Sequence, residues 1–425
     1  MFIMKDTFKY YILLTLIYLG IFWSFIQYSI TGLFSYWDEL YAMIFIPVFV
    51  YDITNKNIRK MDVILLVIIV TFSFVGICGN LFNSYASIGA TMSDVFLNTK
   101  FFMCLYLTMS IFNKIDIEKY RTKIRKHIVV LTYIFLLLFV LNRILNLFPI
   151  YEVRFGISSE QLIFTHPTFC ASAIFYLILL RVLFVHDLCK NKINIDVFLT
   201  LLLCVIVVFT LRFKAIATIL LFIALSIYML NPYIRQLKWI IIVLGVGAVL
   251  FLSYEHILAY FTGYGLRNYP RGVLLLTSIK IMADYFPFGT GFGTFGSYMS
   301  GVHYSPVYYK YQISDIYGIT KDNYNAMTDQ YWPMIAGQTG VIGLICMVCV
   351  WAILFMKICR VKVYNKMYFI AALSSLIYIL VSSTSESAVC NPACVPFAII
   401  LGLIFSQDNT NKYFCKDNES IKENL

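Results

Sequence analysis

Charged residues are scarce in this chain of 425 residues: they make up 13% of it, against 60% hydrophobic residues. Soluble domains carry about 25% charged residues. Polar stretches long enough to hold a soluble core are also missing, apart from one between Ile257 and Gln330. These deficits argue against an ordinary soluble enzyme and indicate a polytopic membrane protein with one ordered polar segment.

A signal-peptide cleavage site is missing as well. The first apolar run, residues 10–30, is long enough to span a bilayer and lacks a small-residue cleavage pattern, so we expect it to be the first membrane helix. Most of the 11 cysteines lie inside apolar runs. They are therefore expected to be small apolar residues rather than disulfides or metal ligands.

Long apolar runs, by contrast, recur along the whole chain. Each is close to the ~20 residues that a bilayer requires, and together they predict an all-α fold with about 12 transmembrane helices. The predicted helices lie near residues 10–30, 36–51, 62–82, 96–112, 128–148, 168–186, 195–211, 215–231, 237–257, 331–356, 367–383 and 388–405. The expected organisation is nine helices in residues 1–257, a large extracytoplasmic loop in 258–330, three helices in 331–405 and a cytoplasmic tail in 406–425.

Basic residues set the expected orientation. Most of the 33 Lys and Arg residues fall where they would be cytoplasmic if the N-terminus is inside, so both termini are predicted to be cytoplasmic. The net charge of +11 is thereby assigned to cytoplasmic loops, and nucleic acid is not expected as a partner.

A few cations break this rule. Arg212 and Lys214 lie in a very short outer turn, and Arg267, Arg271 and Lys280 belong to the large loop. Cations kept at an outer face suggest an anionic ligand there. The alternative for Arg212 and Lys214 is that they extend along the helices to reach lipid phosphates.

The large loop is predicted to contain an amphipathic helix. Pro270 suits the first position of a helix that runs to about Tyr285. Thr277, Lys280 and Asp284 share one face of this helix, with apolar residues elsewhere. Such a helix is expected to lie along the membrane interface.

A glycine-rich run at 286–296 follows, and its close spacing of glycines requires a tight backbone. It contains the GxGxxG pattern of dinucleotide-binding proteins. We reject that interpretation, because no strand is expected before the run and its predicted position is extracytoplasmic. The aromatic-rich stretch at 304–311 fits either packing against sugar rings or an interfacial aromatic belt.

The segments around these cations resemble the bacterial O-antigen polymerase and O-antigen ligase superfamily. Arg212 occupies the place of the family's Ser-Arg element, although Leu211 replaces the Ser. Arg271, followed by residues 284–296, resembles the family's arginine, helix and glycine-rich run. The resemblance covers the whole chain in topology and is concentrated between Arg212 and Gly343.

Residues 329–343 resemble the element that opens the helix after the large loop in this family. Ligases carry a His near its start, whereas this chain has Asp329 and Gln330, which favours a polysaccharide repeat-unit polymerase. The resemblance then implies that the protein joins undecaprenyl-diphosphate-linked glycans at the outer face of a bacterial cytoplasmic membrane. The implied partners are this lipid-linked glycan, the bilayer, a chain-length regulator and a flippase.

The implied enzyme is a metal-independent glycosyltransferase without a cofactor, and it needs cations for the departing diphosphate and a base for the acceptor hydroxyl. The catalytic candidates are Arg212, Arg271, Asp329 and His303. The substrate-binding candidates are Lys214, Arg267, Lys280, Asp284, Gly291, Gly293 and Tyr331. Asp329 is the first choice for the base, with His303 and Asp284 as alternatives, and its structural alternative is a helix N-cap.

Asp38 and Glu39, near the start of the second predicted helix, raise the question of a metal. Because no second acidic cluster accompanies them, we expect an ion-paired or structural element and no metal. Two other functions remain open: an O-antigen ligase, and a flippase for lipid-linked oligosaccharides. A flippase would be expected to show internal repeats and charges near the bilayer midplane, and neither is found in the sequence.

Overall fold

The computed structural model describes residues 6–30, 32–55, 58–113, 115–154, 156–186, 195–230, 247 and 262–407. Helices dominate this part of the chain. Its only strands form a short antiparallel pair, β1 (Val153–Arg154) and β2 (Ile157–Ser158). The predicted all-α class is confirmed, although the sequence did not predict the small hairpin.

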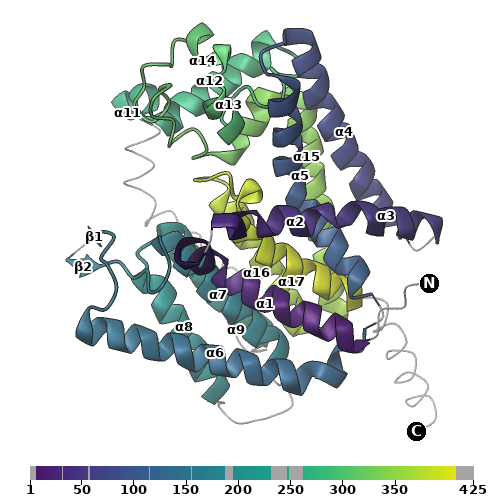
Figure 1. Cartoon of the computed structure of the whole chain (residues 1–425), viewed down its shortest axis with the longest axis vertical. Coiled ribbons are helices and arrows are strands. Elements are labelled where there is room, and N and C mark those ends of the chain that lie inside the picture. Colours follow the sequence, from purple (N-terminus) through teal and green to yellow (C-terminus); the bar gives the residue numbers. More distant parts are fainter. Residues whose placement is uncertain are drawn as a thin grey trace.

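The helices fall into three groups along the chain. Before the large loop come α1 (Asp6–Ser29), η1 (Gly32–Tyr36), α2 (Trp37–Met43), α3 (Phe45–Thr54), α4 (Lys60–Asn83), α5 (Ile88–Ile111), α6 (Ile117–Leu145), α7 (Pro167–Phe184), α8 (Ile195–Phe209) and α9 (Phe213–Leu230). The loop carries α11 (Gly263–Asn268), α12 (Pro270–Asp284), α13 (Tyr298–Val302) and α14 (Pro306–Lys310). After it come α15 (Tyr331–Tyr364), α16 (Lys366–Ser382), η3 (Ala388–Cys390), η4 (Pro392–Cys394) and α17 (Val395–Ser406). Figure 1 shows the loop helices gathered at one end of the molecule, which we call the loop end.

Several helices are apolar enough to be membrane-embedded. By length and composition, 7 segments of the described residues can cross a membrane: Asp6–Ser29, Gly32–Thr54, Lys60–Asn83, Ile117–Leu145, Pro167–Phe184, Phe213–Leu230 and Tyr331–Val361. Shorter apolar helices occupy Ile195–Phe209, Lys366–Ser382 and Pro392–Ser406. Of the helix predicted at 237–257, only residue 247 belongs to the described residues, so the total of about 12 spans stays a prediction.

Some predicted helices have different bounds in the structure. The helix predicted at 36–51 is divided at Ile44 into α2 and α3. α6 begins at Ile117 rather than near 128, because the side chain of Asp116 accepts the backbone N–H of Lys119 and caps the helix. Hydropathy finds the apolar part of such a helix and misses its charged first turns.

The large loop is an ordered unit, as expected. Its small hydrophobic core consists of Val273, Leu274, Ile281, Phe295, Tyr304, Val307, Tyr308, Ile313, Ile319 and Met327. α12 starts with Pro270, as predicted. Thr277 is only 4% exposed, whereas Lys280 and Asp284 are exposed, so the polar face of α12 is narrower than predicted.

The glycine-rich run attaches this loop to the long helices. Gly291 donates its backbone N–H to the carbonyl of Gln338 in α15 at 2.8 Å. Gly289 has a φ of 74°, and a Cβ there would lie 2.6 Å from the carbonyl oxygen of Gly337. Gly340, opposite, kinks α15 with a φ of 60°. The glycines therefore permit close packing of two backbones, and the element before them is helix α12 rather than a strand.

The opposite end of the molecule is tied by charged side chains. Lys357 of α15 lies 2.5 Å from Asp62 of α4, and Arg59 donates to the carbonyl of Phe405 at 3.1 Å. These contacts join the start of α4 to the far parts of α15 and α17. The end of α1, the starts of α5, α7 and α15, and the segment that follows α16 instead line a cavity next to the loop helices.

Candidate active site

Arg212 lies in the turn between α8 and α9, as predicted. Leu211 precedes it with a left-handed φ of 54°, which lets the chain reverse within very few residues. The Nη2 atom of Arg212 lies 3.1 Å from Glu152 Oε1, and its guanidinium lies 5.2 Å from the centroid of the Tyr151 ring. The Arg212 side chain is only 16% exposed. It is paired inside the protein, which argues against its extension toward lipid phosphates.

Lys214 connects the same turn to the segment after α16. Its Nζ lies 2.6 Å from Glu386 Oε2. The neighbouring Ser387 donates its backbone N–H to the carbonyl of Thr328 at 2.8 Å. The turn that carries Arg212 is therefore brought next to the last residues of the large loop, although the two are far apart in the sequence.

Arg271 and Asp329 form an ion pair within the large loop. Nε and Nη2 of Arg271 each lie 3.3 Å from Asp329 Oδ2. Burial raises the pKa of Asp329, while Arg271 and Lys214 oppose this shift. The N-cap of α15 is Gln330, without a side-chain cap. The N-cap explanation of Asp329 is therefore wrong, and its carboxylate faces a cation instead.

Two cavities meet at this carboxylate. The central cavity has a volume of about 910 Å³ and is lined by parts of α1, α2, α5, α7, α13 and α15, with Glu386 and the residues after it. The side cavity, of about 560 Å³, is lined by Tyr269, Pro270, Arg271, Tyr317, Gly318, Asn323, Asn325, Ala326 and Asp329. Asn325 and Asp329 line both cavities. Volumes of this size are typical of binding sites for small molecules.

His166 is a site residue that the sequence analysis missed. It caps α7 and lines the central cavity. Its Nε2 atom lies 3.5 Å from Arg212 Nη2. Burial, with Arg212 and Lys214, lowers the pKa of His166 to about 4. Its position directly before Pro167, at the start of an apolar helix, was the available signal, but only contact with Arg212 distinguishes it from an ordinary cap.

Of the predicted site residues, Arg271 and Asp329 line a cavity, whereas Arg212 and Lys214 contact residues on the wall of one. The remaining predicted residues lie apart from both cavities. His303, Arg267 and Lys280 are exposed. Asp284 accepts a hydrogen bond from the Tyr311 hydroxyl at 2.6 Å. Gly291, Gly293 and Tyr331 are buried by the protein itself, and Tyr331 is fully covered. The structure thus brings Arg212, Lys214, Arg271 and Asp329 together and leaves the rest of the predicted set apart.

Asp38 and Glu39 form ion pairs, as expected. Nζ of Lys100 in α5 lies 2.6 Å from Asp38 Oδ2 and 2.9 Å from Glu39 Oε1. Glu39 and Lys100 line the central cavity. Among the described residues, no group of three or more His, Cys, Asp or Glu side chains is arranged to hold a metal ion.

Comparison with known proteins adds no relative. No family model matches the sequence, and the search of curated proteins found no match.

Proposed function

We propose that this protein is a membrane glycosyltransferase that joins undecaprenyl-diphosphate-linked repeat units into O-antigen or capsular polysaccharide. The observation that carries the proposal is a chain of contacts beside two adjoining cavities. Arg271 and Asp329 line the side cavity, and Asp329 also lines the central cavity. Arg212 and Lys214 contact His166 and Glu386, which lie on the wall of the central cavity. The two arginines, Lys214 and Asp329 come from separate parts of the chain, and the sequence analysis had assigned all four to one reaction. The apolar helices would hold the lipid-facing part of this site in the bilayer.

The central cavity is the better place for the diphosphate of the donor. The contacts of Arg212 and Lys214 with His166 and Glu386 lie on its wall. A guanidinium binds phosphate oxygens through two parallel hydrogen bonds and keeps its charge at any physiological pH. In this proposal Arg212, with help from Lys214, stabilises the negative charge that develops on the departing lipid diphosphate.

The side cavity suits the sugar of the acceptor. Tyr269 and Tyr317 contribute aromatic side chains to its lining, and Asn323 and Asn325 contribute amide donors and acceptors for hydroxyl groups. Asp329, shared by both cavities, lies where acceptor and donor would meet. Arg271, bound to Asp329, would hold its carboxylate in place.

The reaction then needs one bond formed and one broken. The acceptor hydroxyl oxygen attacks the anomeric carbon of the donor glycan, and Asp329 takes the hydroxyl proton. The bond from that carbon to the diphosphate oxygen breaks, and the lipid diphosphate leaves with the electron pair beside Arg212. Burial favours this role for Asp329, because a raised pKa makes a carboxylate a stronger base.

The test is to incubate purified protein with a synthetic lipid-diphosphate repeat unit and to size the glycan. The wild type should yield a ladder of lengths, whereas Arg212→Ala and Arg271→Ala should yield none while still accumulating in the membrane. Normal ladders from both variants would refute the roles given to these arginines. Absence of any ladder from the wild type would refute the polymerase proposal and turn attention to a ligase or a flippase.

A further inference from the structure

The tautomer of His166 is set by the start of α7. Nδ1 of His166 lies 3.1 Å from the backbone N–H of Thr168, which can only donate. Nδ1 must therefore accept this bond, and a neutral imidazole has one donor and one acceptor nitrogen. The hydrogen of the neutral ring is consequently on Nε2.

With this tautomer, the Nε2–H of His166 and the guanidinium of Arg212 are two hydrogen-bond donors that face each other. Nε2 of His166 lies 3.5 Å from Nη2 of Arg212, and a guanidinium cannot accept a hydrogen bond. The two groups therefore do not bond to each other, although Arg212 Nη2 is paired with Glu152. Within the described part of the chain, Arg212 Nε is also buried without a hydrogen-bond acceptor. Such an arrangement of donors is completed by an oxygen that accepts from both side chains.

The surrounding charge favours an anionic oxygen. The aligned peptide dipoles of α7 place partial positive charge at the start of this helix, as at the N-terminus of any helix. Arg212 and Lys214 add full charges, and together with burial they lower the pKa of His166 to about 4. His166 is therefore neutral at physiological pH and remains a hydrogen-bond donor through Nε2–H.

We propose that His166, on the wall of the central cavity, and Arg212 beside it form a binding site for a phosphate-ester oxygen, in which His166 acts as a neutral donor and not as a base. This inference rests on the proposed function, since it names the group that holds the diphosphate of the lipid-linked donor. A neutral imidazole with its hydrogen on Nε2 has no lone pair there to take a proton from an acceptor hydroxyl.

Two substitutions separate binding from capping. His166→Gln places an amide N–H near the position of Nε2 but is a poor helix cap. His166→Asn caps the helix well, but its side chain is too short to reach a phosphate oxygen bound by Arg212. The probes are undecaprenyl diphosphate and inorganic pyrophosphate, titrated into purified full-length protein, with thermal unfolding recorded in parallel. We expect His166→Gln to bind undecaprenyl diphosphate within about 3-fold of the wild type and His166→Asn about 10-fold more weakly.

The opposite ranking, with full affinity in His166→Asn and loss in His166→Gln, would show that His166 only caps α7 and would overturn the inference. Nitrogen NMR of labelled histidine supplies a second readout, because it distinguishes the two neutral tautomers. A neutral His166 with its hydrogen on Nδ1 would also overturn the inference. Binding without glycan synthesis would refute the proposed polymerase but not the phosphate site, so the two failures are distinguishable.

Discussion

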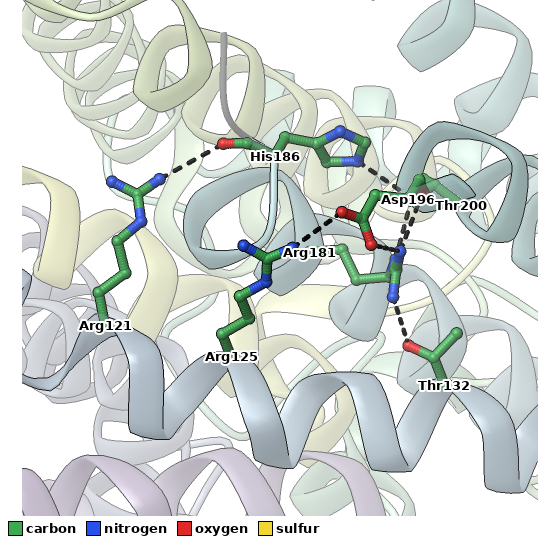
Figure 2. A network of polar contacts seen from close by, with 7 residues as sticks. All are labelled: Arg121, Arg125, Thr132, Arg181, His186, Asp196 and Thr200. Atoms are coloured by element: carbon green, nitrogen blue, oxygen red, sulfur yellow. Dashed lines mark hydrogen bonds and ion pairs between the residues drawn. The ribbon is translucent and has the colours of Figure 1, made fainter. Parts of the chain in front are cut away.

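The two ends of α7 carry polar clusters of different kinds. In the last turn of α7, Arg181 is fully buried and donates to the hydroxyls of Thr200 and Thr132 at 3.0 and 2.9 Å and to the carbonyl of Asp196 at 2.9 Å (Figure 2). At the start of α7, about 22 Å away at ~1.5 Å per residue, His166 and Arg212 face each other as donors beside the central cavity.

This difference separates a structural cluster from a binding site. The cluster around Arg181 has acceptors on each of its three guanidinium nitrogens and joins α6, α7 and α8. At the loop end, Arg212, Lys214 and Arg271 are paired with carboxylates, but these pairs are partly exposed, and two of the carboxylates, Glu386 and Asp329, line a cavity. A ligand with phosphate oxygens can replace a carboxylate in such pairs, because both offer similar acceptors.

The comparison predicts that the two clusters fail in different ways, and Arg181→Met tests the structural one. Removing Arg181 leaves the buried hydroxyls of Thr132 and Thr200 without this donor, and the loss of one partner of a buried hydrogen bond costs about 1–3 kcal/mol. We expect a loss of that size in the free energy of unfolding, measured with denaturant in detergent micelles. Activity per folded molecule should stay unchanged.

Glu118→Ala is the matched control, because Glu118 pairs with Arg121 at the same end but is exposed. It should cost less than about 1 kcal/mol, as exposed ion pairs usually do. A loss of activity in folded Arg181→Met protein would show that the end of α7 away from the loop also takes part in function.

Asp329→Asn tests the loop end and is expected to have the next largest effect. The variant keeps the shape of the side chain but cannot take a proton, so polymerisation should slow by about a hundredfold or more. The wild type should lose activity as the pH falls through the raised pKa of Asp329, since the protonated carboxyl is not a base. Glycan synthesis measured across pH should lack this acid limb in the variant. Full activity of Asp329→Asn would remove Asp329 from the reaction.

Sequence reasoning found the helices and the cations for the same physical reason. Apolar runs, and the positions of charged residues between them, are local properties of a sequence. Arg212, Arg271 and the ordered loop could therefore be predicted from the sequence alone. Helix starts were less visible, because a single cap such as Asp116 extends α6 through a charged stretch that hydropathy assigns to a loop.

The parts that could not be predicted depend on contacts between distant segments. His166 and Glu386 have no sequence pattern that marks them as functional, and they join the site only because their chain segments pack against the Arg212 turn. Gly291 and Gly293 were assigned to substrate for their motif. In the structure Gly291 lies against Asn80 of α4 and donates to α15, and Gly293 lies against Ala90 of α5, so close packing accounts for both glycines. A glycine motif indicates that the backbone is closely approached, but it does not indicate whether a ligand or another helix approaches it.

A smaller effect is expected from the pH dependence of stability. The folded protein holds the pKa of His166 at about 4, below its usual value of 6.5, so between these values the unfolded chain binds more protons. Stability should therefore fall as the pH is lowered from 6.5 to 4. For a partly exposed group this amounts to a loss on the order of 1–2 kcal/mol.

Thermal unfolding of the wild type and of His166→Asn across this range isolates the contribution of His166, because the other titrating groups are common to both proteins. The variant should show the shallower decline. Equal slopes would mean that the imidazole is protonated as readily in the folded protein as in the unfolded chain, and the positive environment at the start of α7 would be weaker than proposed.

The smallest expected effect comes from Glu386→Gln, which removes the carboxylate paired with Lys214 at the loop end. If a diphosphate must replace Glu386, its removal should tighten the binding of undecaprenyl diphosphate by about 5-fold, or ~1 kcal/mol. Asp196→Asn is the matched change at the other end of α7, where Asp196 pairs with Arg181 and Arg125. It should lower stability and leave affinity unchanged. Weaker binding in Glu386→Gln would mean that the carboxylate positions Lys214 for the ligand. The ion pairs at both ends of α7 would then be structural, and the two ends would differ only in their access to ligand.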